Sequence, residues 1–219
     1  MKVEMLDFTT NSGINQMNKD RILMKKAKEE NRAFFRIYNF SSKVITLGFL
    51  QKEEEVVYKE ICNRDKIEVV SRPTGGGSVF HYNDITYSVV LPLEHPLAQA
   101  GVLKSYERIA KIFKKAFEKT GLKIREYKGK AIRSPFCFSA PAPFELLIDH
   151  KKFMGSAQLR RDGILLQQGV IMFGEPSGIE NYIKNVDRTK FTFLLKWIDI
   201  DYKDMVNIIY KTWKENYEV

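Results

Sequence analysis

Residues 72–81 read RPTGGGSVFH and lie between two apolar runs at 67–70 and 85–91. Both runs are typical of β-strands, so the three consecutive glycines connect strands. Because glycine has no Cβ, such a loop can adopt positive φ and bring its backbone N–H groups against a ligand. A plain hairpin needs only a short connection, without an arginine and a histidine at its ends. We interpret the stretch as a ligand-binding loop, with a structural turn as the alternative.

The glycine spacing differs from that of two common phosphate-binding motifs. The chain contains no G-x-x-x-x-G-K-[ST] sequence, and no G-x-G-x-x-G sequence opens a helix. The sequence therefore predicts neither a P-loop nor a dinucleotide-binding fingerprint.

The composition indicates a globular protein with a basic surface. The chain has 219 residues, 44% of them hydrophobic, and 36 basic against 27 acidic residues give a net charge of +9. No apolar run approaches the ~20 residues that span a bilayer, and the N-terminus lacks a signal-peptide core, so we expect a cytoplasmic protein without membrane contact. A basic surface favours acidic partners. No nucleic-acid motif is present, and an acidic protein fits the charge.

The two cysteines, Cys62 and Cys137, are too few for a disulfide framework, and with three scattered histidines they predict no metal site. Cys62 ends a short helix expected over 53–62, where we expect a packed, unreactive residue. Cys137 lies between two phenylalanines in the sequence SPFCFSAP. It is either a buried cysteine in an aromatic patch or a nucleophile, which needs a nearby cation to favour its thiolate.

The hydrophobic pattern of the remaining chain predicts an α+β fold. Strands outnumber helices and come in neighbouring pairs, which favours a mixed or antiparallel central sheet flanked by helices. We expect helices over 14–30, 102–117 and 201–217, strands over 33–38, 43–49, 122–127, 144–148 and 163–173, a turn over 39–42 and an irregular segment over 128–142.

Lys152 follows a polar turn and precedes the small residues Gly155, Ser156 and Ala157. A lysine at a turn is usually solvated. The small residues, however, let the backbone pack closely against a bound chain, and a lysine held there could polarise a carbonyl oxygen. Because Lys151 and Lys152 are adjacent, they face opposite ways in an extended segment. The spacing to Gly155 favours Lys152 in the pocket and Lys151 in solvent.

These motifs together resemble those of the lipoate–protein ligase and octanoyltransferase superfamily. The 72–81 stretch is similar to its arginine–triglycine–histidine signature, and KFMGSAQ at 152–158 is similar to its lysine-x-x-Gly-Ser-Ala element. Weaker similarities at Met17, Asp20, 47–51 and 166–171 extend the resemblance to most of the chain. It implies a biotin/lipoate-protein-ligase-like catalytic domain. It also implies a substrate-binding role for Arg72, Gly75, Gly76, Gly77, Ser78, His81, Gly155, Ser156 and Ala157.

Within that superfamily, CFSAP at 137–141 resembles the Cys-Phe-x-x-Pro element of the LipM-type octanoyltransferases, in which the cysteine precedes the lysine motif. The resemblance implies that Cys137 and Lys152 are catalytic. Two positions depart from the superfamily pattern: Ser71 replaces the first arginine of an Arg-Arg pair, and Gln168 replaces a histidine. The short segment after 173 leads us to expect one catalytic domain over 1–219 without a full C-terminal accessory domain.

The resemblance implies an octanoyltransferase of protein lipoylation. Octanoyl would pass from acyl carrier protein to Cys137 and then to a lysine of a lipoyl-domain protein such as the glycine-cleavage H protein. Both partners are typically acidic, and the reaction needs no metal or nucleotide. Two alternatives remain: the catalytic subunit of a lipoate–protein ligase that uses ATP and Mg, and a non-catalytic module that binds lipoyl groups.

Overall fold

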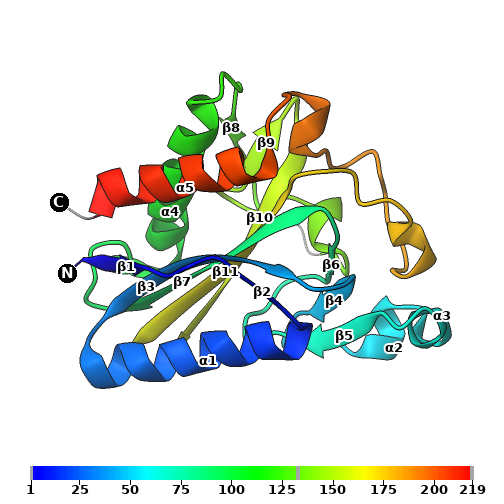
Figure 1. The fold of residues 1–219 in the computed structure, drawn as a ribbon, viewed down its shortest axis with the longest axis horizontal. Helices are drawn as coiled ribbons and strands as arrows, with labels where there is room; N and C mark the ends of the chain where they lie inside the picture. The colour runs from blue at the N-terminus through cyan, green and yellow to red at the C-terminus, as the bar shows by residue number, and fades with distance from the viewer. Residues whose placement is uncertain (1, 132–133, 218–219) are drawn as a thin grey trace.

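The computed structural model describes residues 2–131 and 134–217 (Figure 1). Met1, Ile132, Arg133, Glu218 and Val219, which belong to the expected 1–219 domain and in part to its irregular segment, lie outside the described residues. Within them, two β-sheets are flanked by helices. The α+β fold with a mixed sheet is thus confirmed, and the extent of the domain stays a prediction.

The larger sheet has eight strands and carries most of the core. Seven of them lie in the order β1 (Val3–Met5), β3 (Ala33–Phe40), β7 (Asp84–Pro92), β11 (Ile164–Met172), β10 (Lys151–Arg161), β9 (Leu146–Ile148) and β8 (Arg125–Glu126), and β2 (Thr9–Asn11) also pairs with β3. Neighbours from β3 to β8 are antiparallel, whereas β1 and β2 run parallel to β3. The smaller sheet has the order β5 (Glu68–Ser71), β4 (Val44–Leu47) and β6 (Val79–His81).

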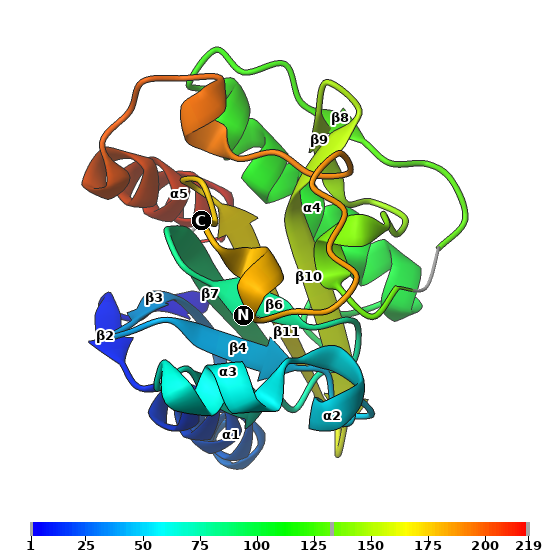
Figure 2. The same cartoon turned by 90° about the vertical axis from the view of Figure 1, so that its right-hand side faces the viewer.

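Helices cover both faces of the larger sheet. Figures 1 and 2 show α1, α2 and α3 on one side of the molecule and α4 and α5 on the other. The helices are α1 (Gly13–Glu30), α2 (Glu53–Val56), α3 (Lys59–Arg64), α4 (Gly101–Glu118) and α5 (Tyr202–Tyr217), with 3-10 turns η1 (Cys137–Ser139), η2 (Ile179–Asn181) and η3 (Leu194–Lys196). None of the helices in the described ranges is long and apolar enough to cross a membrane.

Alternating side chains of β3 explain why the sheet needs helices on both faces. Phe35 packs with α4 and α5, where Trp213 stacks on it with ring centroids 4.2 Å apart. The next residue back, Phe34, belongs to the core under α1 together with Leu23. Because successive side chains of a strand point to opposite faces, one apolar strand supplies both cores.

Several expected boundaries differ from the structure for local reasons. The expected helix over 53–62 is broken into α2 and α3, and Cys62 is buried in α3 as expected. The expected turn over 39–42 is shortened because β3 continues to Phe40, and the expected strand over 122–127 keeps only β8. Phe144 has φ of +68°, outside the strand region, so β9 starts later than predicted. The last three residues of the 72–81 stretch form β6 instead of loop.

Candidate active site

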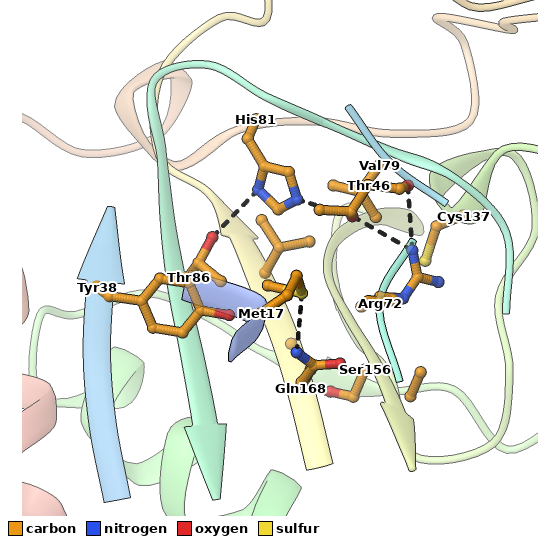
Figure 3. Close-up of a pocket in the computed structure, with 14 residues that line it drawn as sticks. Met17, Tyr38, Thr46, Arg72, Val79, His81, Thr86, Cys137, Ser156 and Gln168 are labelled. Carbon is orange, nitrogen blue, oxygen red and sulfur yellow. Dashed lines mark hydrogen bonds between the residues drawn. The ribbon is translucent and has the colours of Figure 1, made fainter. Parts of the chain in front are cut away.

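A pocket opens between the two sheets, beside the glycine loop. Figure 3 shows Cys137 and Arg72 at one side of it and Tyr38 at the opposite side. Its wall is a mixture of polar side chains and apolar surface: Met17, Tyr38, Thr46, Arg72, Val79, His81, Thr86, Cys137, Gly155, Ser156, Ala157, Gln168, Gly169 and Val170. Eight different elements of the fold contribute, so the pocket exists only in the folded chain.

Arg72 holds the glycine loop in shape. Its Nη2 donates to the carbonyl oxygens of Gly75 at 2.6 Å and Gly77 at 2.7 Å. Its Nη1 donates to the carbonyl oxygen of Thr46 at 3.2 Å, which ties the loop to β4. Gly76 has φ of +87°, a conformation that L-residues rarely adopt. The guanidinium therefore stabilises a loop that only glycine permits, and it also lines the pocket.

The glycine loop is fastened to the cysteine segment by backbone hydrogen bonds. Ser78 N donates to Pro135 O at 2.8 Å, and Cys137 N donates to Ser78 O at 2.9 Å. A Cβ on Gly77 would lie 2.6 Å from Ser134 O and 2.8 Å from Cys137 N. The close approach of the two segments requires glycine at this position, and it fixes where the Cys137 backbone lies.

Lys152 is buried directly behind Cys137. Its Nζ donates to Cys137 O at 2.6 Å and to Ala140 O at 3.3 Å, and it lies 3.5 Å from Cys137 Sγ. The same Nζ forms an ion pair with Glu145 Oε2 at 2.8 Å. Lys152 is only 2% exposed, so it is not the solvated lysine that is usual at a turn. Lys152 is the second residue of β10, and a β-bulge follows it.

Burial and the charge of the partner have opposite effects on the pKa of each group in the ion pair. Burial would lower the pKa of the Lys152 ammonium, but its interactions with Cys137 and with the Glu145 carboxylate outweigh burial and raise the pKa above the ordinary value. Lys152 therefore stays cationic near neutral pH. Burial also raises the pKa of the Glu145 carboxyl, although Lys152 opposes this shift. A cation beside a sulfur is the arrangement that favours a thiolate.

Glycine at position 155 leaves room for the sulfur. A Cβ built on Gly155 would lie 3.0 Å from Cys137 Sγ and 3.0 Å from Lys152 Cε. The next side chain, Ser156, shares a 2.7 Å hydrogen bond with the Tyr87 hydroxyl. The small residues of β10 thus bring thiol and ammonium together at the pocket wall.

Gln168 and Ser71, the two departures from the superfamily pattern, have different surroundings. The Gln168 amide is buried: its Oε1 accepts from Thr74 Oγ1 at 2.8 Å and its Nε2 donates to Asp20 Oδ2 at 2.7 Å. Asp20 is itself paired with Arg36 at 2.8 Å. Gln168 therefore links the glycine loop to a buried ion pair. Ser71 is exposed at the end of β5, where its carbonyl accepts a long 3.5 Å bond from Arg21.

His81 is oriented inside the pocket by three partners. Its Nδ1 lies 2.8 Å from Asp84 Oδ2 and 3.2 Å from Thr86 Oγ1, and its Nε2 lies 2.9 Å from Thr46 Oγ1. With both ring nitrogens engaged and the residue 4% exposed, His81 is a fixed part of the pocket wall.

The structure brings most of the predicted site residues to one place. Arg72, His81, Gly155, Ser156 and Ala157 line the pocket together with Cys137. The remaining predicted residues lie behind its wall, where they hold the segments in place: Gly75, Gly76, Gly77, Ser78 and Lys152.

Three features of the site differ from, or are absent from, the sequence analysis. Lys151 is half-buried instead of fully solvated. The segment around Cys137 is a 3-10 turn, η1. The sequence analysis also missed Glu145, whose only signal is a carboxylate next to the apolar run of β9. Among residues 2–131 and 134–217, no group of three His, Cys, Asp or Glu side chains is arranged to hold a metal ion.

Comparison with known proteins gives one consistent family. The model of the lipoyl protein ligase A/B catalytic domain matches residues 13–193. Octanoyltransferase LipM of Carboxydothermus hydrogenoformans is 36% identical over 170 residues, covering 76% of this chain and 63% of that protein. LipM of Clostridioides difficile is 32% identical over 164 residues, covering 73% of this chain and 60% of that protein. The chain thus spans about three fifths of the length of these relatives.

Solved structures agree on the fold. Lipoate-protein ligase A, solved bound with ATP, superposes with a TM-score of 0.82 at 18% identity, over 98% of this chain and 85% of that one. At this identity the likeness concerns the fold. The family match over most of the chain goes further: this protein belongs to the lipoyl protein ligase A/B catalytic domain family.

Proposed function

We propose that this protein is an octanoyltransferase of protein lipoylation, with Cys137 as its acyl carrier. Octanoyl arrives as the thioester of acyl carrier protein, moves to Cys137 Sγ, and leaves on the ε-amine of a lipoyl-domain lysine. The observation that carries the proposal is the Lys152 ammonium 3.5 Å from the sulfur of a half-buried cysteine that lines a pocket. The relatives named octanoyltransferase LipM support the same chemistry.

Each residue then has a definite task in the first transfer. The Cys137 thiolate attacks the carbonyl carbon of the incoming thioester, a bond from sulfur to carbon forms, and the carrier thiol leaves with a proton. Lys152 Nζ, 3.5 Å from Sγ, stabilises the thiolate before attack, and its positive charge also stabilises the negative charge that develops on the carbonyl oxygen during attack. The lack of a Cβ at Gly155 leaves room for the Cys137 sulfur and for Lys152, and the lack of one at Gly169 leaves room for the Tyr87 ring behind the pocket wall.

The second transfer uses the same wall of the pocket. A neutral lysine amine attacks the acyl-Cys137 carbonyl, and the amide bond forms as the bond from carbon to sulfur breaks. The proton that the amine nitrogen gives up passes to the departing Cys137 sulfur, which restores the thiol beside Lys152. Exchange of an acyl group between a thioester and an amine is chemically complete without nucleotide or metal, so the proposal includes no cofactor.

A basic cleft beside the pocket supports encounter with acidic partners. It runs between α1 and the β10–β11 hairpin, and Arg72 lines both the cleft and the pocket. Arg21, Lys25, Lys28 and Arg161 contribute its positive side chains, against Glu29 and Asp162. With a net charge of +9 over the chain, this side would attract an acidic carrier or lipoyl domain.

One set of incubations tests the proposal. The protein is mixed with a lipoyl-domain acceptor and either octanoyl-acyl carrier protein or lipoate with ATP and Mg, and the acceptor is read by intact mass. We expect acceptor modification from the octanoyl carrier, loss of it in Cys137→Ser, and retention in the matched variant Cys62→Ser, whose thiol is buried 1% exposed in α3.

Other outcomes would overturn the proposal in different ways. Modification that needs lipoate and ATP, and that survives Cys137→Ser, would make the protein a ligase subunit. No modification under either condition would leave a lipoyl-binding module.

A further inference from the structure

The Glu145 carboxylate has no task in the transfer described above, yet it is buried next to the reacting groups. Glu145 is 7% exposed, and its Oε2 accepts from Lys152 Nζ at 2.8 Å and from Ala142 N at 2.7 Å. A buried carboxylate is costly unless it is paired, and its partner here is the ammonium that also contacts Cys137. Cys137, Lys152 and Glu145 therefore form one connected set.

The number of donors on Lys152 makes the set unusual. An ammonium has three N–H groups, but Nζ has four acceptors around it: Glu145 Oε2 at 2.8 Å, Cys137 O at 2.6 Å, Ala140 O at 3.3 Å and Cys137 Sγ at 3.5 Å. The two carbonyl groups anchor Nζ in place. The Cys137 sulfur and the Glu145 carboxylate compete for the remaining N–H group. Lys152 Nζ therefore lies between Cys137, which must lose a proton, and Glu145, which can accept one.

We propose that Glu145 takes up the proton that Cys137 loses, and that Lys152 relays it between them. An Nζ–H bond breaks as the Glu145 O–H bond forms, and the freed Nζ lone pair accepts the thiol proton as the S–H bond breaks. The result is a thiolate, a restored ammonium and a neutral carboxylic acid. No charge enters or leaves the buried set, and the stored proton is available to the departing carrier thiol.

The surroundings of Glu145 favour holding that proton. Burial raises the pKa of the Glu145 carboxyl, which brings the acid form closer to neutral pH. The titratable groups that face it are Lys152 on β10, Tyr106 on α4 and Tyr87 on β7, and Cys137 on η1 is reached through Lys152. Burial raises the pKa values of both tyrosines well above neutrality, so neither competes for the proton between pH 5 and 9.

In this account Glu145 is a positioning residue, since it acts on the sulfur only through Lys152. The inference rests on the proposed function for the role of Cys137 as nucleophile. Its test does not use an acyl donor, so it can fail while octanoyl transfer is demonstrated, and it can succeed while the acyl substrate proves to be another.

The test is the pH dependence of Cys137 alkylation by iodoacetamide, followed by intact mass in a Cys62→Ser background. Because an internal transfer to Glu145 couples the titrations of Cys137 and Glu145, the alkylation rate should rise with pH in two steps. It first rises to a plateau when the set of Cys137, Lys152 and Glu145 loses one proton, and it rises again when the set loses a second proton. Glu145→Gln cannot store a proton, so its profile has one step. Glu126→Gln, on the neighbouring strand β8, is the matched control and keeps both steps.

A single step in the parent protein would overturn the inference, and this result needs no variant to fold. Two steps that persist in the Glu145→Gln variant would overturn it as well, because another group would then hold the proton. A second measurement is the NMR titration of the Glu145 side-chain carbon. We expect it to sense the first alkylation step in the parent and to lose that step in Cys137→Ala. An unchanged titration would contradict the relay.

Discussion

Replacing Lys152 by alanine is the most informative perturbation, because the neighbouring Lys151 offers a matched comparison. The side chains of Lys152 and Glu145 are 3% and 7% exposed and form a 2.8 Å ion pair. Lys152→Ala leaves the Glu145 carboxylate buried and unpaired, which costs about 3–5 kcal/mol of unfolding free energy. Lys151 is half-buried and outside this set, so Lys151→Ala should change stability by only about 0.5 kcal/mol.

The assay is urea unfolding followed by circular dichroism, with the acyl-transfer rate measured on the same samples. Lys152→Met combined with Glu145→Gln removes both charges and should recover most of the lost stability, because a buried ion pair can be replaced by neutral side chains at small cost. Acyl transfer should remain slower by about 10²–10³ in both Lys152 variants, since the cation that stabilises the thiolate and the developing oxyanion is gone. Equal losses from Lys151→Ala and Lys152→Ala would refute the reasoning, as would a double variant less stable than Lys152→Ala.

Three further predictions concern the packing and charge around the site. Gly155→Ala places a Cβ 3.0 Å from Cys137 Sγ; it should cost about 1–3 kcal/mol by overpacking and slow Cys137 alkylation, and an unchanged alkylation rate would show that the sulfur has more room than the structure gives it. Gly77→Ala directs a Cβ to 2.6 Å from Ser134 O and should lower the urea midpoint more than Gly75→Ala in the same loop, where an added Cβ would meet nothing within 4 Å; the reverse order would contradict the close approach of the two segments. Hydrogen bonds from Lys104 and Lys111 lower the pKa of Glu107 to about 2, so the stabilising effect of its charge is present above the ordinary carboxyl pKa of 4.5 and is lost as pH falls toward 2. The difference in unfolding free energy between the parent and Glu107→Gln, measured by urea unfolding at a series of pH values, should shrink over that range. A constant difference would exclude the charge as its cause.

The sequence was informative where a residue type has one physical use. Three consecutive glycines between two β-runs predict a loop in which backbone must approach something closely, and the structure places Gly77 against the segment that carries Cys137. The strands expected over 85–91 and 163–173 are rich in Ile, Leu and Val, and the structure forms them as β7 and β11. Their pairing with each other is seen only in the structure. The single-domain extent and the roles of the site residues remain predictions.

The sequence was uninformative where a contact depends on the path of distant segments. Lys152 follows a polar turn, and its burial depends on residues 190–192, whose backbone is hydrogen-bonded to the Lys152 backbone. Glu145 follows Phe144, whose φ of +68° bends the backbone just before β9 begins. This bend lets the Glu145 carboxylate pair with Lys152. Neither hydrophobic periodicity nor secondary-structure propensity predicts such contacts, so the partner of Lys152 is seen only in the three-dimensional structure.

The most direct test of the central claim is to locate the acyl group on the enzyme. The protein is incubated with octanoyl-acyl carrier protein without acceptor, digested, and its peptides are read by mass spectrometry before and after hydroxylamine, which cleaves thioesters. We expect a hydroxylamine-sensitive octanoyl group on the peptide that contains Cys137 and none on the peptide that contains Cys62. An octanoyl group found elsewhere, or acceptor modification without any octanoyl-enzyme, would contradict the thioester mechanism.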